Sequence, residues 1–308
     1  MTASLVLLWS VAQPAARVET KWAQVAPVVR QSGSFERSPH RHRAVVLVQG
    51  LRPHPFSNRN VTKADWHGWQ KAGSRLVKAL ATDADVFAFA YGQNVAVDRI
   101  AGADCLGDNV RRLKRLGYAE IVLVGYSAGG LVARHFVEDH PDAGVTKVVQ
   151  VCAPNGGSGW AEARALLRKG QREFLASLAK HGRQQCLARR AGKKIPESVE
   201  FVCVVGHLGL DVSVMASLEV EEGRVVHLAA AVSAQGDGMV SSGCQWTAEL
   251  QDQGIPVVPM EIGHFRVMRA RAGVETIARL VRDRQPRWNA GQVAEARRKL
   301  FGAEPALP

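Results

Sequence analysis

The chain has 308 residues, of which 46% are hydrophobic, so it is long and apolar enough to bury a large globular core. It carries 40 Lys and Arg against 28 Asp and Glu, a net charge of +12. This excess allows contact with an anionic membrane surface. However, the basic residues are scattered, and no nucleic-acid-binding module accompanies them. No apolar run approaches the roughly 20 residues that cross a bilayer. Composition therefore argues against nucleic-acid binding and against an integral membrane protein.

The N-terminus and the cysteines bear on the cellular compartment. Residues 5–12 form a short apolar stretch, but no Lys or Arg precedes it, so the positive region of a secretory signal is missing. Five cysteines without a CxxC pair favour reduced thiols and a cytoplasmic setting, with a secreted or periplasmic protein as the alternative. They are Cys105, Cys152, Cys186, Cys203 and Cys244.

Strands and helices alternate along most of the chain, which is typical of a parallel sheet covered by helices on both faces. Apolar runs predict strands at 43–49, 85–91, 121–124, 146–153, 199–205, 224–232 and 255–262. Helical periodicity predicts helices at 64–80, 104–116, 128–140 and 273–284. In the first of these helices, Leu76, Val77 and Leu80 are expected to face the core.

One segment interrupts the alternation. Residues 155–197 begin with a polar, glycine-rich turn and continue as one or two helices dense in Arg and Lys. This insertion is interpreted either as a solvated surface element or as a cap over a pocket, because it follows a strand end. We therefore expect an N-terminal segment (1–40), a core domain (41–285) that contains the insertion, and a loosely attached tail (286–308) with one short helix near 293–300.

The most informative motif is Gly125-Tyr-Ser-Ala-Gly129. The preceding residues, 121–124, are aliphatic and predict a strand that is buried on both faces. A helical pattern begins directly after the motif. This strand–turn–helix context is that of a nucleophile elbow, which presents the serine on a sharp turn. Glycine is expected at both ends because a side chain there would collide with the neighbouring strand or helix. The motif predicts Ser127 as a nucleophile.

A serine hydroxyl needs a base within hydrogen-bonding distance, and the base needs a carboxylate to orient it. After an elbow these partners follow in the chain order acid and then histidine. Asp237 lies between two glycines after a predicted strand, and His264 follows the strand at 255–262. Asp211 and His207 also follow a strand and remain the alternatives. The predicted triad is Ser127, Asp237 and His264.

Acyl transfer also requires donors for the developing oxyanion. The backbone N–H of Ala128 is one candidate, because it follows the nucleophile at the start of a helix. The second is the N–H of Leu51, in the turn that Gly50 permits after the first long strand. The adjoining segment from Arg52 to Trp69, rich in aromatic residues and proline, is interpreted as a pocket wall or as packing against the first helix.

Four stretches together resemble the α/β-hydrolase superfamily, and within it the triacylglycerol lipase and esterase branch, which is also similar to deacylases of inositol-linked lipids. The stretches are 125–134 (GYSAGGLVAR), 153–158 (APNGGS), 236–240 (GDGMV) and 263–265 (GHF). The resemblance covers roughly residues 44–283. It implies an α/β-hydrolase fold for 41–285, with a mostly parallel, doubly wound sheet and a helical cap insertion. It also implies catalytic Ser127, Asp237 and His264.

Two positions depart from the pattern of that branch. Gln49-Gly50 stands where His-Gly is usual, and Ala153-Pro154-Asn155 stands where Thr-Pro-His is typical. Neither change removes a catalytic group, so both bear on the substrate.

The leading hypothesis is a carboxylic-ester hydrolase acting on a small-molecule ester or lipid, without cofactor or metal. One alternative is a thioesterase or acyltransferase with the same triad. The other is a non-catalytic protein whose basic insertion binds an anionic surface.

Overall fold

The computed structural model describes residues 18–28, 35–52, 61–102, 104–162, 169–207 and 236–302. Residues 1–16, Asp211 and the predicted strand 224–232 lie outside these ranges. The strands are β1 (Thr20–Ala26), β2 (Arg43–Val48), β3 (Asp85–Tyr91), β4 (Glu120–Tyr126), β5 (Lys147–Val151), β6 (Glu200–Gly206) and β7 (Val257–Met260). The α-helices are α1 (Arg75–Leu80), α2 (Val97–Ala101), α3 (Asp104–Arg115), α4 (Ala128–Asp139), α6 (Arg172–Leu178), α7 (Lys180–Arg189), α9 (Ser242–Gln245), α10 (Ala248–Asp252), α11 (Arg271–Arg282) and α12 (Ala290–Phe301).

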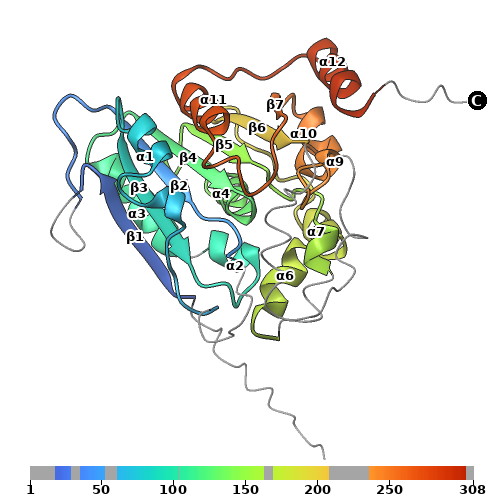
Figure 1. Cartoon of the computed structure of the whole chain (residues 1–308), viewed down its shortest axis with the longest axis horizontal. Coiled ribbons are helices and arrows are strands. Elements are labelled where there is room, and N and C mark those ends of the chain that lie inside the picture. The colour runs from blue at the N-terminus through green and yellow to red at the C-terminus, as the bar shows by residue number, and fades with distance from the viewer. Residues whose placement is uncertain are drawn as a thin grey trace, which may run out of the picture.

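These strands form one sheet in the order β1-β3-β2-β4-β5-β6-β7 (Figure 1). β1 pairs with β3 in the antiparallel sense, and every other neighbouring pair is parallel. Because the order runs outward in both directions from β2, the sheet is doubly wound, as predicted. The carboxyl ends of β2, β4, β5 and β6 meet at one edge, where an α/β sheet places its functional groups.

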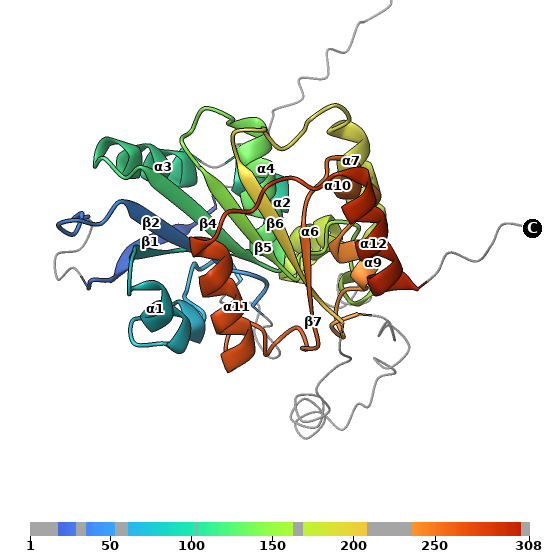
Figure 2. The ribbon, with the colours of Figure 1, turned by 90° about the horizontal axis from the view of Figure 1, so that it is seen from above.

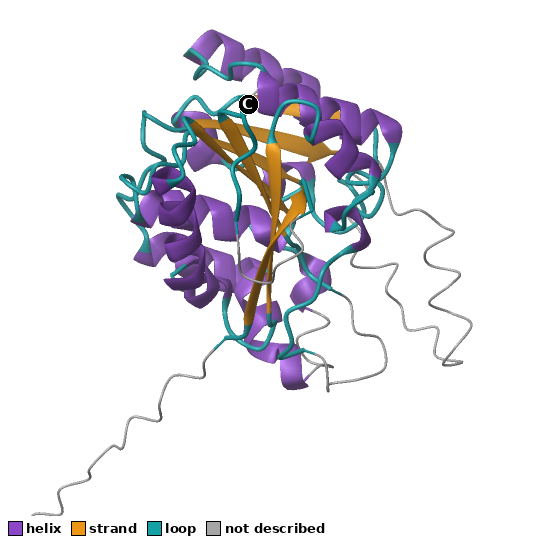
Figure 3. Cartoon of the chain, turned by 90° about the vertical axis from the view of Figure 1, so that its left-hand side faces the viewer, coloured by secondary structure: helices purple, strands orange, loops and turns teal. Residues whose placement is uncertain are grey.

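Helices cover both faces of the sheet (Figures 2 and 3). Side chains on a strand point alternately to the two faces. In β2, Ala44, Val46 and Val48 therefore join the core beneath α3 and α4, whereas Val45 and Leu47 join the core beneath α1 and α11. All five are fully buried, which explains why the central strands are continuous apolar runs.

The predicted helix over 64–80 is wrong in its extent. A short 3-10 turn occupies Gly68–Gln70, and the α-helix begins only at Arg75. Gly73 has a φ of 82°, which interrupts the helix, and the hydroxyl of Ser74 then accepts a hydrogen bond from the backbone N–H of Val77. The predicted core residues of this helix, Leu76, Val77 and Leu80, are buried.

The N-terminal segment and the C-terminal tail both contribute to the fold. β1 lies within residues 1–40 and adds an edge strand that the sequence analysis did not predict. In the tail, α12 packs against α9, and the rings of Trp246 and Phe301 stack with centroids 6.3 Å apart. Trp288 also contacts Trp246, edge to face, so the tail is attached through one buried tryptophan.

Within the described part of the chain, no helix combines the length and the apolar character that crossing a bilayer would require. All five cysteines lie in described ranges, and none forms a disulfide.

Candidate active site

The elbow lies where β4 ends at Tyr126 and α4 begins at Ala128. Ser127 has φ 53° and ψ −124°, a strained conformation for a residue with a side chain. A Cβ at Gly125 would lie 2.5 Å from the carbonyl oxygen of Gly129, and one at Gly129 would lie 2.1 Å from that of Gln49. Both contacts are impossible, so glycine at these two positions lets α4 start directly against the sheet.

The structure brings the three predicted triad side chains together at the carboxyl edge of the sheet. Nε2 of His264 lies 3.0 Å from Oγ of Ser127, and Nδ1 of His264 lies 2.6 Å from Oδ2 of Asp237. All three residues are buried, with exposed fractions of 6%, 5% and 0% for Ser127, His264 and Asp237. This is the order of contacts, hydroxyl to imidazole to carboxylate, that a serine nucleophile requires.

Backbone groups fix the carboxylate of Asp237. Its Oδ1 accepts hydrogen bonds from the N–H groups of Met239 at 2.9 Å and Val240 at 2.8 Å, which leaves Oδ2 for the imidazole. The backbone N–H of His264 also donates to the carbonyl oxygen of Asp237 at 2.9 Å. Gly206 ends β6 beside this pair, where an added Cβ would lie 2.7 Å from Cβ of Asp237. The acid and the base are therefore positioned relative to each other by main-chain contacts.

Cys152 lies next to Asp237. It follows β5 with a φ of 51° and is fully buried, and burial followed by the charge of Asp237 raises the pKa of its thiol well above the ordinary value. Its Sγ and ligand atoms of Asp237 and His264 lie within 4.8 Å of one another, which is close enough for a metal. However, Asp237 and His264 already bond to each other, and His264 also bonds to Ser127. The arrangement fits a hydrogen-bonded triad.

The turn after β2 lies directly against the nucleophile. A Cβ on Gly50 would come within 2.9 Å of Cβ of Ser127, so only glycine permits this approach. Leu51 follows and lines the same pocket as Ser127. Gln93 holds the turn: its Nε2 donates to the carbonyl oxygen of Gly50 at 3.1 Å, and its Oε1 accepts from the N–H of Arg52 at 3.1 Å.

A second side chain contacts the same turn. Nε2 of His67 lies 3.3 Å from the carbonyl oxygen of Gly50, and burial lowers the pKa of His67 to about 4. The neutral ring therefore donates its N–H to this carbonyl at neutral pH. His67 belongs to the segment that the sequence left as a pocket wall or as packing against the first helix. Gln93 had no predicted role, because a lone glutamine after a strand carries no motif.

Apolar side chains dominate the pocket around Ser127. Trp160 and Leu178 come from the insertion, so this segment lines part of the pocket. Among the described residues that line it, none carries an acidic, Lys or Arg side chain. The apolar lining comprises Leu51, Pro154, Trp160, Ala161, Leu178, Met239, Val240 and Phe265.

The rival residues are not part of this arrangement. His207 follows β6 and is absent from the described pocket lining, and its backbone N–H donates to the carbonyl oxygen of Met260. Asp211 lies outside the described residues. Asp237 and His264 are thus the acid and the histidine that the structure brings to Ser127.

No family model and no curated protein matches the sequence. Solved structures do match its fold. The mature form of the lipase BlEst2 from Bacillus licheniformis superposes with a TM-score of 0.59 at 13% identity, over 85% of this chain and 98% of that one. The phospholipase PlaB from Legionella pneumophila superposes with a TM-score of 0.53 at 14% identity, over 84% of this chain and 62% of that one. Together with the seven-stranded, mostly parallel sheet, these matches show that the chain has the α/β-hydrolase fold.

Proposed function

We propose that the chain is a serine hydrolase that cleaves carboxylic esters through an acyl-enzyme intermediate. The observation that carries this proposal is the continuous contact from Ser127 Oγ to His264 Nε2 and from His264 Nδ1 to Asp237 Oδ2, at 3.0 and 2.6 Å. A buried serine that is merely structural has no need of a histidine whose second nitrogen is held by a carboxylate. The similarity to structures described as a lipase and a phospholipase supports the same chemistry.

In the first half of the proposed reaction, Oγ of Ser127 attacks the ester carbonyl carbon while Nε2 of His264 takes the hydroxyl proton. The tetrahedral intermediate collapses, the carbon–oxygen bond to the alcohol breaks, and the imidazolium returns its proton to the leaving oxygen. In the second half, water attacks the acyl-serine by the same route and releases the acid. Asp237 keeps the Nδ1–H tautomer in place and stabilises the imidazolium.

Backbone N–H groups are proposed to stabilise the oxyanion. Ala128 is the first residue of α4, so its N–H has no acceptor in an earlier turn of that helix and lies at the positive end of the dipole. The N–H of Leu51 is the second proposed donor. Gln93 and His67 bind the carbonyl oxygen of the preceding Gly50, and this fixes the orientation of the peptide unit that carries the Leu51 N–H.

The pocket supports an ester with an apolar acyl group. Its described lining is largely aliphatic and aromatic, and lacks the cationic side chain that a carboxylate or phosphate next to the reacting bond would call for. Trp160 and Leu178 would contact the acyl or alcohol group, so the insertion is proposed to select the substrate.

The described part of the insertion gives less support to the hypothesis that the insertion binds an anionic membrane surface. Several of its cations are paired with the core domain: Arg190 contacts Glu138 and Asp139 at 2.8 and 2.9 Å, and Lys193 contacts Asp139. Arg183 is buried. These basic residues of the insertion therefore serve to attach it to the core domain.

Replacing Ser127 tests the proposal. Ser127→Ala should lower kcat on a short-chain aryl ester at least about 10⁴-fold while the melting temperature stays close to that of the parent. The matched control is Ser158→Ala, which removes another pocket hydroxyl, one that donates to the carbonyl oxygen of Met239 at 2.7 Å. Retained activity in pure Ser127→Ala would contradict the proposal. Rates on an oxyester and a thioester with the same acyl group would separate ester hydrolysis from the thioesterase alternative.

A further inference from the structure

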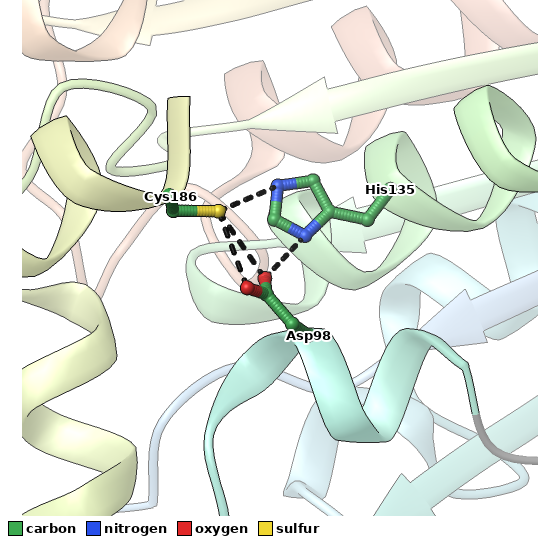
Figure 4. A group of neighbouring side chains, drawn as sticks. All are labelled: Asp98, His135 and Cys186. Carbon is green, nitrogen blue, oxygen red and sulfur yellow. Dashed lines mark hydrogen bonds and ion pairs between the residues drawn. The ribbon is translucent and has the colours of Figure 1, made fainter. Parts of the chain in front are cut away.

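A second cluster of reactive side chains lies away from the triad, where the insertion meets the core domain (Figure 4). Asp98 comes from α2, His135 from α4 and Cys186 from α7. Sγ of Cys186 lies 3.4 and 3.3 Å from the two carboxylate oxygens of Asp98 and 4.0 Å from Nε2 of His135. Nδ1 of His135 lies 2.8 Å from Oδ1 of Asp98. A thiol, an imidazole and a carboxylate thus converge from three separate helices.

One nitrogen of the imidazole in this cluster contacts the carboxylate of Asp98 but makes no well-aligned hydrogen bond. Although Nδ1 of His135 is close to Asp98, the two are not aligned as a hydrogen bond, and Nδ1 is buried without a hydrogen-bond partner. The exposed fraction of His135 is only 1%. A buried polar atom without an aligned partner is destabilising, and a ligand at this position would remove that penalty.

The spacing of the three groups matches a metal site. In tetrahedral zinc sites the bonds to sulfur, nitrogen and oxygen are about 2.0–2.3 Å long, which places neighbouring ligand atoms roughly 3.4–3.6 Å apart. Here ligand atoms of all three residues lie within 4.8 Å of one another, and the Cys186–Asp98 separations already have the required length. The 2.8 Å separation between Nδ1 of His135 and Oδ1 of Asp98 is shorter than this, so side-chain rotations that lengthen it would complete the geometry.

We propose that Asp98, His135 and Cys186 bind a zinc ion that fastens the insertion to the core domain. A mixed set of sulfur, nitrogen and oxygen ligands suits zinc and disfavours magnesium or calcium, which take oxygen ligands. Binding displaces the Cys186 thiol proton to solvent, and the thiolate and the Asp98 carboxylate then balance the two positive charges of the ion. This assignment does not depend on the proposed esterase activity, and it revises the expectation from sequence that the protein binds no metal.

Two neighbouring cations have to be accommodated. The guanidinium of Arg189 lies 3.7 Å from Oδ2 of Asp98, on the exposed side of the cluster, and can stay paired with that oxygen while Oδ1 binds the ion. The guanidinium of Arg183 lies 3.2 Å from Nε2 of His135, and its Nε donates to the carbonyl oxygen of Asn155 at 3.1 Å. Once Nδ1 binds the ion, Nε2 carries the ring proton, so Arg183 can no longer donate to it. Arg183 also lies against Cys186, one turn further along α7, and can donate to the metal-bound sulfur. Hydrogen bonds to ligands are a regular part of zinc sites.

Solvent can supply the fourth ligand. Asp98 and Cys186 line a cavity of about 400 Å³, together with Glu162, Glu173 and His181. This cavity offers both an entry path for the ion and room for a coordinated water. The carboxylates of Glu162 and Glu173 would also attract a cation towards the site.

Cobalt provides a direct test, because it replaces zinc and reports thiolate ligation in its absorption spectrum. The full chain, stripped with a chelator and then dialysed, should bind one equivalent of Co²⁺ with a thiolate-to-cobalt charge-transfer band and the visible bands of a tetrahedral ion. Zn²⁺ should abolish both. Zinc at a hundredfold excess over its Kd should also raise the melting temperature by about 3–6 °C.

Two variants locate the ion. Cys186→Ser should lose the charge-transfer band and weaken Zn²⁺ binding at least about 100-fold, and Asp98→Asn should weaken it at least about tenfold. Cys105→Ser, which alters a half-exposed thiol on α3, is the matched control and should bind as the parent does. Absence of stoichiometric binding by the parent would overturn the proposal. So would a band that persists in Cys186→Ser, or one that disappears only in Cys152→Ala, because the ion would then lie at the triad.

Discussion

The phenol hydroxyl of Tyr126 donates a 2.9 Å hydrogen bond to the carbonyl oxygen of His264. The residue directly before the nucleophile thus holds the backbone of the histidine, although 138 positions in the chain separate the two. The rings of Tyr126 and His264 also pack with centroids 5.1 Å apart. The elbow therefore presents the serine and also fixes the position of its partner.

Removing this hydroxyl should slow catalysis without preventing binding. In Tyr126→Phe the backbone of His264 loses one buried hydrogen bond worth about 1 kcal/mol, so we expect kcat to fall roughly five- to tenfold with KM nearly unchanged. Steady-state kinetics on a soluble ester measures this. Tyr118→Phe, which removes a buried phenol bonded to Asp85 far from the site, is the control and should leave kcat intact. Equal kcat values for Tyr126→Phe and the parent would show that the hydrogen bond does not position the base.

Gln93 should act through the oxyanion turn. Gln93→Leu removes the donor to the carbonyl oxygen of Gly50 and the acceptor for the N–H of Arg52, so the turn that carries Leu51 becomes less ordered. We expect kcat to fall about tenfold or more. Gln24→Leu is the matched control, because Gln24 makes the same two kinds of contact with the backbone of Glu36 on the far edge of the sheet. If both variants lower kcat equally, the effect of Gln93 is one of general stability.

Ser127 and His264 could be predicted because each follows a strand, and Asp237 because the chain order of a triad is restricted. β1 could not be predicted in the same way. It is a half-exposed edge strand in which polar and apolar residues mix, so it lacks the continuous apolar run of a central strand. The predicted helix over 64–80 is too long because the apolar periodicity was followed across Gly73 and across the helix cap at Ser74, after which the α-helix actually begins. The cluster of Asp98, His135 and Cys186 has no sequence signature at all, since only the packing of three helices brings it together.

The glycine at 129 should be intolerant of any side chain. A Cβ there would lie 2.1 Å from the carbonyl oxygen of Gln49, a backbone atom that cannot rotate away. We expect Gly129→Ala to lower the free energy of unfolding by at least about 2 kcal/mol in urea denaturation. Gly243→Ala is the control: its Cβ would meet no atom within 4 Å, and alanine in α9 should be neutral or stabilising by up to about 1 kcal/mol. Equal stability of the two variants would contradict the close approach of α4 to the turn after β2.

Stability should fall as the pH is lowered from about 6.5 towards 4. Burial lowers the pKa of both His67 and His135 to about 4 in the folded, metal-free protein, against 6.5 as the ordinary value. Below 6.5 the unfolded chain binds these protons and the folded chain does not, so the free energy of unfolding decreases with falling pH, by up to about 3 kcal/mol for each histidine. The loss from these groups is complete near pH 4, and above about pH 7 they contribute no slope.

His67→Gln should flatten the dependence of the free energy of unfolding on pH. The amide of glutamine does not take up a proton between pH 4 and 7, and it can still donate a hydrogen bond to the carbonyl oxygen of Gly50. Urea unfolding at several pH values between 4 and 7.5 measures the slope. His181→Gln, at an exposed position on α7, should keep the slope of the parent. A His67→Gln profile that parallels the parent would mean that His67 takes up its proton equally in both states.

The central claim is that Ser127 is a nucleophile activated by His264. The most direct measurement is reaction of the folded protein with a fluorophosphonate probe, followed by peptide mapping. We predict one phosphonate per chain on the peptide that contains Ser127, and loss of that labelling in His264→Ala. A folded protein that stays unlabelled, or a label on a different residue, would contradict the claim.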